Sequence, residues 1–148
     1  MLLKTRSTSP KRAHHRPRPP ASSVIIKIMK TVFLCTPHKL GDLNHELMTR
    51  IKNAGFEVLC AATHSPQDRS LKDIFETNVG LINKSDILVA VLKDYGKDLT
   101  WEVGYAYGKK MPTLGIDYSA LEMDVMTYYS LDKIIKPEEL ETALVSLK

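Results

Sequence analysis

Residues 85–112 read SDILVAVLKDYGKDLTWEVGYAYGKKMP, and this stretch carries the strongest information about the fold. Its first part, Ile87–Leu92, is apolar at every position, as is typical of a strand buried on both faces of a parallel sheet. A polar turn follows, and apolar residues then recur at helical spacing. The pattern predicts a strand, a loop and a helix in that order, with Glu102 in the first turn of the helix.

Glu102 lies on or beside the face that this helix is predicted to turn toward the core. The other residues of that face are Leu99, Val103, Ala106 and Tyr107. An acid in a first turn is stabilised by free backbone N–H groups and by the helix dipole, so it would be ionised. Such a carboxylate can simply stabilise the helix, or it can serve as a nucleophile. Spacing alone leaves both interpretations open.

The sequence on either side repeats the alternation of strands and helices. The other predicted strands span residues 31–35 (a start as early as Val24 is also compatible), 56–62, 112–116 and 131–135. The other predicted helices span residues 43–55, 70–82 and 137–147, the second capped by Ser70 and the third opened by Pro137. This order predicts an α/β three-layer fold, flavodoxin- or Rossmann-like, with a five-stranded parallel sheet. Ligands of such sheets bind outside the carboxyl ends of the strands, where loops 35–41, 61–69, 93–101 and 117–126 would meet.

Asn78 interrupts the apolar stripe of helix 70–82, which otherwise consists of Leu71, Ile74, Phe75, Val79 and Ile82. A polar amide on a core face usually forms hydrogen bonds with neighbouring backbone groups, but at a cleft it can bind a ligand.

The net charge of +4 is unevenly distributed along the 148 residues. Residues 1–23 hold six bases and no acid, which leaves 15 bases against 17 acids in residues 24–148. The basic segment has few large apolar side chains, so we expect a disordered tail followed by one folded domain at 24–148. A basic arm could bind nucleic acid or an acidic membrane, and it loosely resembles a transit peptide, but we favour an extension without function. No apolar run approaches the length of a membrane span, so we do not expect a membrane as partner. We also do not expect a nucleic acid as partner, because residues 24–148 hold slightly more acids than bases.

Cys35 and Cys60 lie in or at the end of predicted strands, with no Cys-x-x-Cys pair and no histidine cluster nearby. We therefore expect reduced, buried cysteines in a cytoplasmic protein, no metal site and no cofactor. Gly-x-Gly-x-x-Gly, Walker and Gly-x-Ser-x-Gly motifs are absent from the sequence, and His38, His45 and His64 are interpreted as surface or loop residues.

The remaining candidates for chemistry are three carboxylates within nine residues: Asp94, Asp98 and Glu102. Asp98 could be only the N-cap of the helix. The runs Ser85–Leu92 and Asp98–Pro112, with Glu-x-Gly-x-Ala followed by Gly-Lys-x-Pro, resemble the signature of the nucleoside 2-deoxyribosyltransferase family. The resemblance covers residues 30 to about 136.

This resemblance implies that Glu102 is a nucleophile that attacks C1′ of a 2′-deoxyribonucleoside. The base leaves, and a second base attacks the glycosyl-enzyme, so that configuration is retained, as in retaining glycosidases. Water in place of the second base would give hydrolysis. The implied ligands are nucleosides and nucleobases.

Several positions depart from the family pattern. Family members commonly carry an aspartate where this chain has Gly96, so Asp98, or else Asp94, would have to assist the leaving base. A second family aspartate corresponds to Asn78, which can form hydrogen bonds with a base but cannot protonate it, so base preference would be altered. Phe33 stands where some members have a tyrosine near the nucleophile.

The resemblance also implies a homo-oligomer, a dimer at least, in which each site is completed by a neighbouring subunit; hexamers are known in the family. The matching segment is Asp124-Val125-Met126, which would contact the 5′ end of the sugar. Because an aspartate repels phosphate, we expect nucleosides rather than nucleotides as substrates. Two alternatives stay open: an N-glycosidase that hydrolyses nucleosides or nucleoside 5′-monophosphates, and a non-catalytic nucleotide-binding or sensory module.

Overall fold

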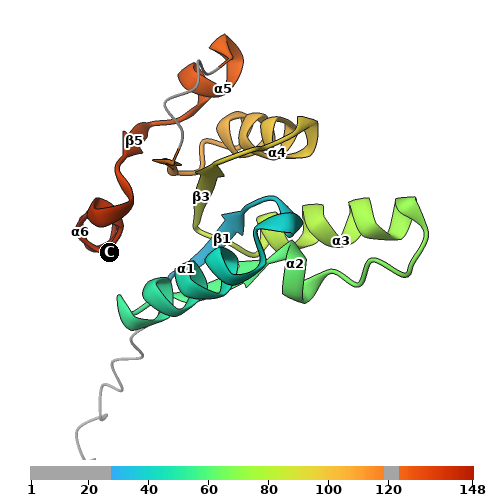
Figure 1. The fold of residues 1–148 in the computed structure, drawn as a ribbon, viewed down its shortest axis with the longest axis horizontal. Coiled ribbons are helices and arrows are strands. Elements are labelled where there is room, and N and C mark those ends of the chain that lie inside the picture. The colour runs from blue at the N-terminus through green and yellow to red at the C-terminus, as the bar shows by residue number, and fades with distance from the viewer. Residues whose placement is uncertain (1–27, 119–123) are drawn as a thin grey trace, which may run out of the picture.

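The computed structural model describes residues 28–118 and 124–148 and contains a five-stranded parallel sheet (Figure 1). The strands are β1 (Thr31–Cys35), β2 (Glu57–Cys60), β3 (Ile87–Leu92), β4 (Thr113–Asp117) and β5 (Lys133–Ile135), in the spatial order β2-β1-β3-β4-β5. The predicted tail at residues 1–23 and the predicted domain start at Val24 lie outside the described residues. The α/β class and the five-stranded parallel sheet are confirmed.

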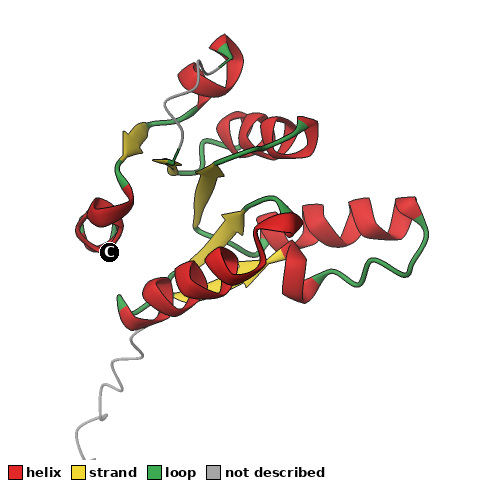
Figure 2. Cartoon of the chain, viewed as in Figure 1, coloured by secondary structure: helices red, strands yellow, loops and turns green. Residues whose placement is uncertain are grey.

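Helices cover both faces of the sheet, as the red ribbons in Figure 2 show. They are η1 (His38–Leu40), α1 (Gly41–Asn53), α2 (Ala61–His64), α3 (Leu71–Asn83), α4 (Lys97–Gly108), α5 (Val125–Ser130), η2 (Pro137–Glu139) and α6 (Leu140–Val145). The buried residues of α1 and α6 pack in one apolar cluster and those of α3 and α4 in another, so these two pairs form the outer layers.

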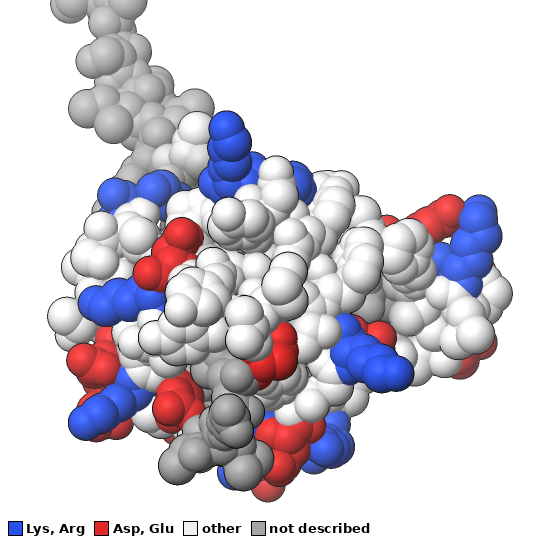
Figure 3. Space-filling view, turned by 90° about the horizontal axis from the view of Figure 1, so that it is seen from above, with Lys and Arg blue, Asp and Glu red and all other residues white. Residues whose placement is uncertain are grey.

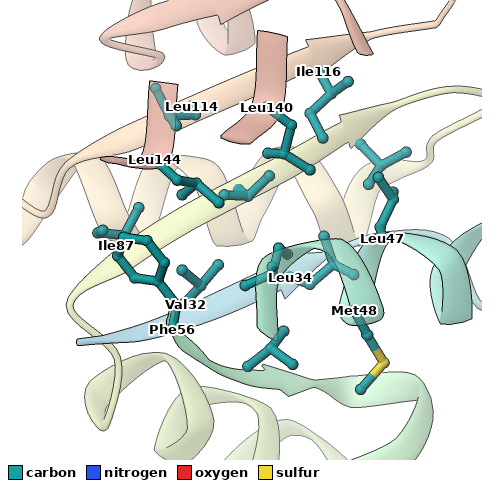
Figure 4. Packing of buried hydrophobic residues seen from close by; sticks show 14 of the residues in the cluster. Val32, Leu34, Leu47, Met48, Phe56, Ile87, Leu114, Ile116, Leu140 and Leu144 are labelled. Carbon is teal, nitrogen blue, oxygen red and sulfur yellow. The ribbon is translucent and has the colours of Figure 1, made fainter. Parts of the chain in front are cut away.

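Strand β1 shows how the sequence divides its side chains between the two faces. Successive side chains of a strand point to opposite faces. Val32 and Leu34 therefore pack with α1 and α6, whereas Phe33 and Cys35 pack with α3 and α4. Figure 4 shows Val32 and Leu34 from β1 in the first of these two clusters, together with Leu47 of α1. The last residue of β1 is thus directed toward α4.

The Ser-Asp pair before β3 has a structural role. The Ser85 hydroxyl donates a hydrogen bond to the Leu81 carbonyl at the end of α3 (2.9 Å). The Asp86 carboxylate accepts one from the Thr31 N–H at the start of β1 (2.8 Å). Both bonds satisfy backbone groups where α3 ends and the central strands begin. This pair therefore fixes the alignment of β1 with β3, between which the order of the sheet reverses.

The main differences from the sequence predictions concern the ends of elements. β2 is shorter than predicted, because residues 61–64 form the turn α2, in which a ring nitrogen of His64 accepts a hydrogen bond from the Cys60 N–H. β4 and β5 begin one and two residues later than predicted. The last predicted helix begins with the short 3₁₀ helix η2 and continues as α6.

Helix α3 exposes part of its apolar stripe. Ser70 caps the helix as predicted, accepting a hydrogen bond from the Asp73 N–H. Leu71 is 86% exposed and Phe75 is 53% exposed, so these two residues of the stripe do not lie in the core. The N-terminal half of α3 extends past the strands in Figure 1, which leaves these side chains without a sheet to pack on. Tyr107, predicted to face the core, is also exposed.

The surface shows acidic and basic side chains interspersed on the face drawn in Figure 3. Within residues 28–118 and 124–148, no helix combines the length and apolar character needed to cross a membrane.

Candidate active site

A cavity of about 740 Å³ opens at the carboxyl ends of β1 and β3. This is the edge of a parallel sheet where ligands are expected, at the point where the strand order changes direction. Its walls come from the end of β1, the loop before α1, the side of α3 and the start of α4. Five of the residues singled out in the sequence line it: Phe33, Asn78, Asp94, Asp98 and Glu102.

Glu102 lies in the second turn of α4, because the helix begins at Lys97, two residues before the start that an N-cap at Asp98 would give. The prediction that Glu102 lies in the first turn is therefore wrong. The free N–H groups at the helix start do not stabilise its ionised form, as had been expected. The side chain is only 9% exposed. Burial raises the pKa of Glu102 to about 6, a hydrogen bond from Cys35 opposes the rise, and the charge of Asp98 adds to it. A buried carboxyl with a raised pKa in a cavity is typical of a functional group.

Cys35 provides a direct contact with this carboxyl group. Its thiol donates a hydrogen bond to Glu102 Oε2 with a sulfur–oxygen distance of 2.9 Å. Both cysteines are unpaired and buried, as expected from the sequence, but Cys60 belongs to the cluster on the opposite face of the sheet. This contact was not predicted from the sequence. The available signal was the position of Cys35 two residues after Phe33, which places both side chains on the same face of β1.

The acidic loop before α4 has a tight conformation. Asp94 has a φ of 46°, in the left-handed region that side chains seldom adopt, although aspartate is among the residues that tolerate it best. Gly96 is the N-cap residue of α4, and no side chain caps this helix end, so the expectation that Asp98 could be the N-cap is wrong. Asp98 lies instead in the first turn, one helical turn before Glu102. Asp94 and Asp98 both border the cavity.

Asn78 projects from α3 between two cavities. It lines the main cavity and also a neighbouring one of about 480 Å³, and Glu102 lines both as well. The side-chain oxygen of Asn78 is buried and has no hydrogen-bond partner within the described part of the chain. Buried polar atoms are nearly always paired, so this unpaired oxygen makes Asn78 a candidate for a ligand contact. The structural alternative, in which the amide bonds to nearby backbone, does not account for this oxygen.

Phe33 is fully buried and borders the cavity, and its side chain carries no polar group. Leu34, Ile74 and Leu99 also border the cavity. Apolar walls with a few convergent polar groups are typical of small-molecule sites.

Asp124 and Met126 do not line this cavity. Asp124 caps α5 by accepting a hydrogen bond from the Thr127 N–H, and this bond, more than any other contact, lowers its pKa. It also accepts one from the Tyr95 hydroxyl (3.3 Å), and Tyr95 does line the cavity. Met126 is 77% exposed.

Basic residues border the cavity as well. His38 and Lys39 come from η1, and Lys97 is the first residue of α4. His38 was predicted to be a surface or loop residue, and neither lysine was predicted to border a site. Their place near the cavity could have been predicted, because they lie in the segments that directly follow β1 and β3.

An exposed aromatic row lies beside the smaller cavity. Trp101 packs edge-on against Phe75, with ring centroids 5.4 Å apart, and stacks on Tyr105 at 5.2 Å. Trp101 is nevertheless 46% exposed, and together with Leu71 and Phe75 it lines the smaller cavity.

Within residues 28–118 and 124–148, no three histidine, cysteine or acidic side chains are grouped so that they could hold a metal ion.

This arrangement defines a small-molecule site built around one buried carboxyl group. The family model described as nucleoside 2-deoxyribosyltransferase matches residues 32–135. The chain belongs to this family, and the resemblance noted in the sequence is confirmed. A search of curated protein sequences found no match.

Several solved structures share the fold. A 2-deoxyribosyltransferase from Bacillus psychrosaccharolyticus has a TM-score of 0.65 at 16% identity, covering 78% of this chain and 90% of that one. A 2-deoxyribosyltransferase from Leishmania mexicana has a TM-score of 0.60 at 15% identity, covering 79% and 97%. A CMP N-glycosidase from Clostridium botulinum has a TM-score of 0.57 at 16% identity, covering 80% and 100%. At these identities the likeness shows the fold, and activity has to be argued from the site.

Proposed function

We propose that this protein transfers 2-deoxyribose between nucleobases by double displacement, with Glu102 as the nucleophile. The observation that carries the proposal is the Glu102 carboxyl group, 9% exposed at a cavity of about 740 Å³. Membership of the nucleoside 2-deoxyribosyltransferase family supports the same chemistry. With a pKa of about 6, Glu102 is mostly ionised at neutral pH and keeps nucleophilic strength.

In the first step a Glu102 oxygen forms a bond to C1′ while the bond from C1′ to the base nitrogen breaks. The electron pair of that bond stays on the base, which takes up a proton or a hydrogen bond as it leaves. Asp98 and Asp94 are the acids beside the cavity that can assist, and we give Asp98 this role because it lies one turn from Glu102. In the second step a nitrogen of another base attacks C1′ and gives up its proton to the group that assisted the leaving base, while the bond from C1′ to Glu102 breaks and Glu102 is released as a carboxylate.

Asn78 is proposed to bind the base. Its unpaired side-chain oxygen accepts a hydrogen bond from an N–H group, and its amide nitrogen donates one to a ring nitrogen or carbonyl oxygen. An amide does not supply a proton, so the choice among bases differs from that of relatives that carry an acid there. Phe33 is proposed to form part of the apolar wall next to the sugar or base.

The exposed apolar residues are proposed to join subunits. Leu71, Phe75 and Trp101 lie beside the cavity that contains Asn78 and Glu102. Exposed apolar clusters of this kind are typical of protein–protein contacts. A second copy that packs there would place its Asp124 and Met126, both exposed on α5, near the 5′ end of the sugar. Reduced cysteines support the cytoplasm as its location.

A second candidate is hydrolysis of a nucleoside 5′-monophosphate, with water in place of the second base. His38, Lys39 and Lys97 border the cavity and are suited to pair with a phosphate group. The fold shared with a CMP N-glycosidase is compatible with this activity. Asp124, which would repel phosphate, is absent from the cavity of its own subunit.

Product analysis separates the candidates. Purified protein is incubated with deoxyinosine and adenine, and in parallel with deoxycytidine and deoxycytidine 5′-monophosphate without a second base. New deoxyadenosine supports transfer, whereas free base and free sugar support hydrolysis. Turnover restricted to the monophosphate would favour the second candidate. No product from any mixture would contradict both and favour a non-catalytic binding module.

A further inference from the structure

The contact between Cys35 and Glu102 joins the end of β1 to the second turn of α4. The Cys35 side chain is 1% exposed, and its sulfur lies 2.9 Å from Glu102 Oε2 and 4.0 Å from the Leu99 carbonyl oxygen. A thiol has a single proton to donate, and the shorter contact is to the carboxylate. Within the described residues, no other hydrogen-bond donor reaches a side-chain oxygen of Glu102.

The surroundings of Cys35 keep it in the thiol form. Burial raises its pKa well above the ordinary value, and the charge of Glu102 and their hydrogen bond act in the same direction. Reactive cysteines are thiolates in exposed, electropositive places, which is the opposite of this environment. Cys35 is therefore a persistent donor and not a nucleophile or a redox centre.

We infer that Cys35 is a positioning residue, whose thiol holds Oε2 of Glu102 and thereby leaves Oε1 as the oxygen that attacks C1′. This inference rests on the proposed function of Glu102. In the attack, Oε1 forms the bond to C1′ as the bond to the base breaks, and the thiol keeps its proton throughout. In the glycosyl-enzyme, the same S–H group donates to the ester carbonyl oxygen. When the second base attacks, the thiol stabilises the returning carboxylate charge.

The donor also sets the orientation of a side chain that has few other constraints. Glu102 extends into a cavity whose nearby walls include the apolar side chains of Phe33 and Leu99. A carboxylate without a bound donor in such a place would swing between rotamers or take up a proton. The small thiol of Cys35, at the last position of β1, lies beside the carboxyl group and donates to it. Phe33, on the same face of β1, has no polar side-chain atom that could donate.

Other titratable groups around the cavity have to be separated from this effect. Asp98 belongs to α4 itself, Asp94, Tyr95 and Lys97 come from the loop and helix start, and His38 and Lys39 come from η1. Of these, Asp98 is a recognised contributor that raises the pKa of Glu102. Cys60 lies in the cluster on the opposite face of the sheet and is coupled to Cys35 and Glu102 only through charge. Burial raises the pKa of Cys60, which keeps it a neutral thiol, so Cys60→Ala serves as the control for loss of a buried thiol without loss of the hydrogen bond.

The test compares Cys35→Ala and Cys35→Ser with Cys60→Ala and the unaltered chain. Steady-state kinetics with deoxyinosine and adenine are measured from pH 5 to 8, and the titration of the Glu102 side-chain carbon is followed by NMR. Cys35→Ala is expected to lower kcat about tenfold with little change in KM, the size of one lost hydrogen bond to a charged group. It should also move the midpoint of Glu102 to higher pH by about one unit. Cys35→Ser keeps a donor and should stay within about threefold of the unaltered kcat, as should Cys60→Ala.

Three results would overturn the inference. The first is a Cys35→Ala variant whose kcat and Glu102 midpoint equal those of the unaltered chain. The second is a Cys35→Ser variant whose kcat is as low as that of Cys35→Ala. The third is an equal loss of kcat in Cys60→Ala, which would indicate that the loss comes from disturbed packing alone. Should Cys35→Ala fail to fold, the kcat of Cys35→Ser and its Glu102 midpoint, measured by NMR, decide whether the inference holds. If the unaltered chain has no activity, the proposed function fails, but the Glu102 midpoint still reports whether the Cys35 hydrogen bond acts on this carboxyl group.

Discussion

Asp98 and Glu102 lie one turn apart on α4, and both side chains line the same cavity. Their environments differ, since Asp98 is exposed and Glu102 is buried. Burial raises the pKa of Glu102, the Cys35 hydrogen bond lowers it, and the charge of Asp98 raises it further, to about 6. Two neighbouring carboxyl groups in different environments can take different roles, one as nucleophile and the other as assistant to the leaving base.

Activity should rise with pH as Glu102 loses its proton. We expect kcat/KM to increase through a midpoint near pH 6 and to level off above pH 7, because only the carboxylate attacks C1′. Asp98→Asn removes a like charge and should move this midpoint to lower pH, in addition to slowing departure of the base. Asp73→Asn, which alters an exposed acid in the first turn of α3, is the control and should leave the midpoint in place. A midpoint unchanged by Asp98→Asn would contradict the coupling.

The stability of the folded chain should depend on the same proton. The pKa of Glu102 is 4.5 ordinarily and about 6 in the folded state, so the folded state binds more protons between these values. The free energy of unfolding therefore falls as pH rises from 4.5 to 6, by about 2 kcal/mol in total. Glu102→Gln has no such proton and should be more stable than the unaltered chain at pH 7.5, but not at pH 4. Urea unfolding at the two pH values measures this; a Glu102→Gln variant that is less stable at pH 7.5 would contradict it.

Asn78 should be more important for turnover than for stability. Asn78→Leu removes an unpaired buried oxygen, so the free energy of unfolding should rise by up to about 1 kcal/mol, while kcat/KM falls at least tenfold. Asn78→Asp should change the relative kcat/KM among adenine, hypoxanthine, cytosine and thymine deoxynucleosides. Both variants are compared by urea unfolding and by competition assays. Equal base preference in all three chains would refute a contact between Asn78 and the base.

Assembly should depend on the exposed apolar residues beside the cavity. Trp101→Glu places a charge in the row formed with Phe75 and Tyr105 and should convert oligomers to monomers, with loss of most activity. Val145→Glu changes a side chain of similar exposure on α6, on the other face of the sheet, and serves as the control. Light scattering after size exclusion gives the mass of each variant. If the unaltered chain is a monomer with full activity, a shared site is ruled out.

Much of the fold followed from the sequence because hydrophobic periodicity distinguishes strands from helices. Strand β3, which is apolar at every position, is buried throughout. Leu47, Met48 and Ile51, which recur at helical spacing, all pack into one buried cluster. The exposure of Leu71 and Phe75 could not be predicted, because an apolar stripe does not reveal whether a sheet, another subunit or solvent faces it.

The candidate site was predictable in its location and incomplete in its contacts. The rule that ligands bind at the carboxyl ends of parallel strands placed Asp94 and Asp98 at this edge of the sheet, next to Glu102, and the family resemblance added Asn78 and Phe33; all five border the cavity. The N-cap lies at Gly96, two residues before the candidate Asp98, and this places Glu102 in the second turn of the helix rather than in the first. The Cys35 contact joins residues 67 positions apart and depends on how β1 packs against α4, which no local pattern encodes.

The most direct test of the central claim is to capture the glycosyl-enzyme. The protein is mixed with deoxyinosine in the absence of a second base, quenched in acid within milliseconds, and its peptides are analysed by mass spectrometry. The account predicts one deoxyribosyl group on the peptide that contains Glu102, its disappearance when adenine is added before the quench, and no adduct in Glu102→Ala. An adduct on another residue, or undiminished turnover by Glu102→Ala, would contradict it.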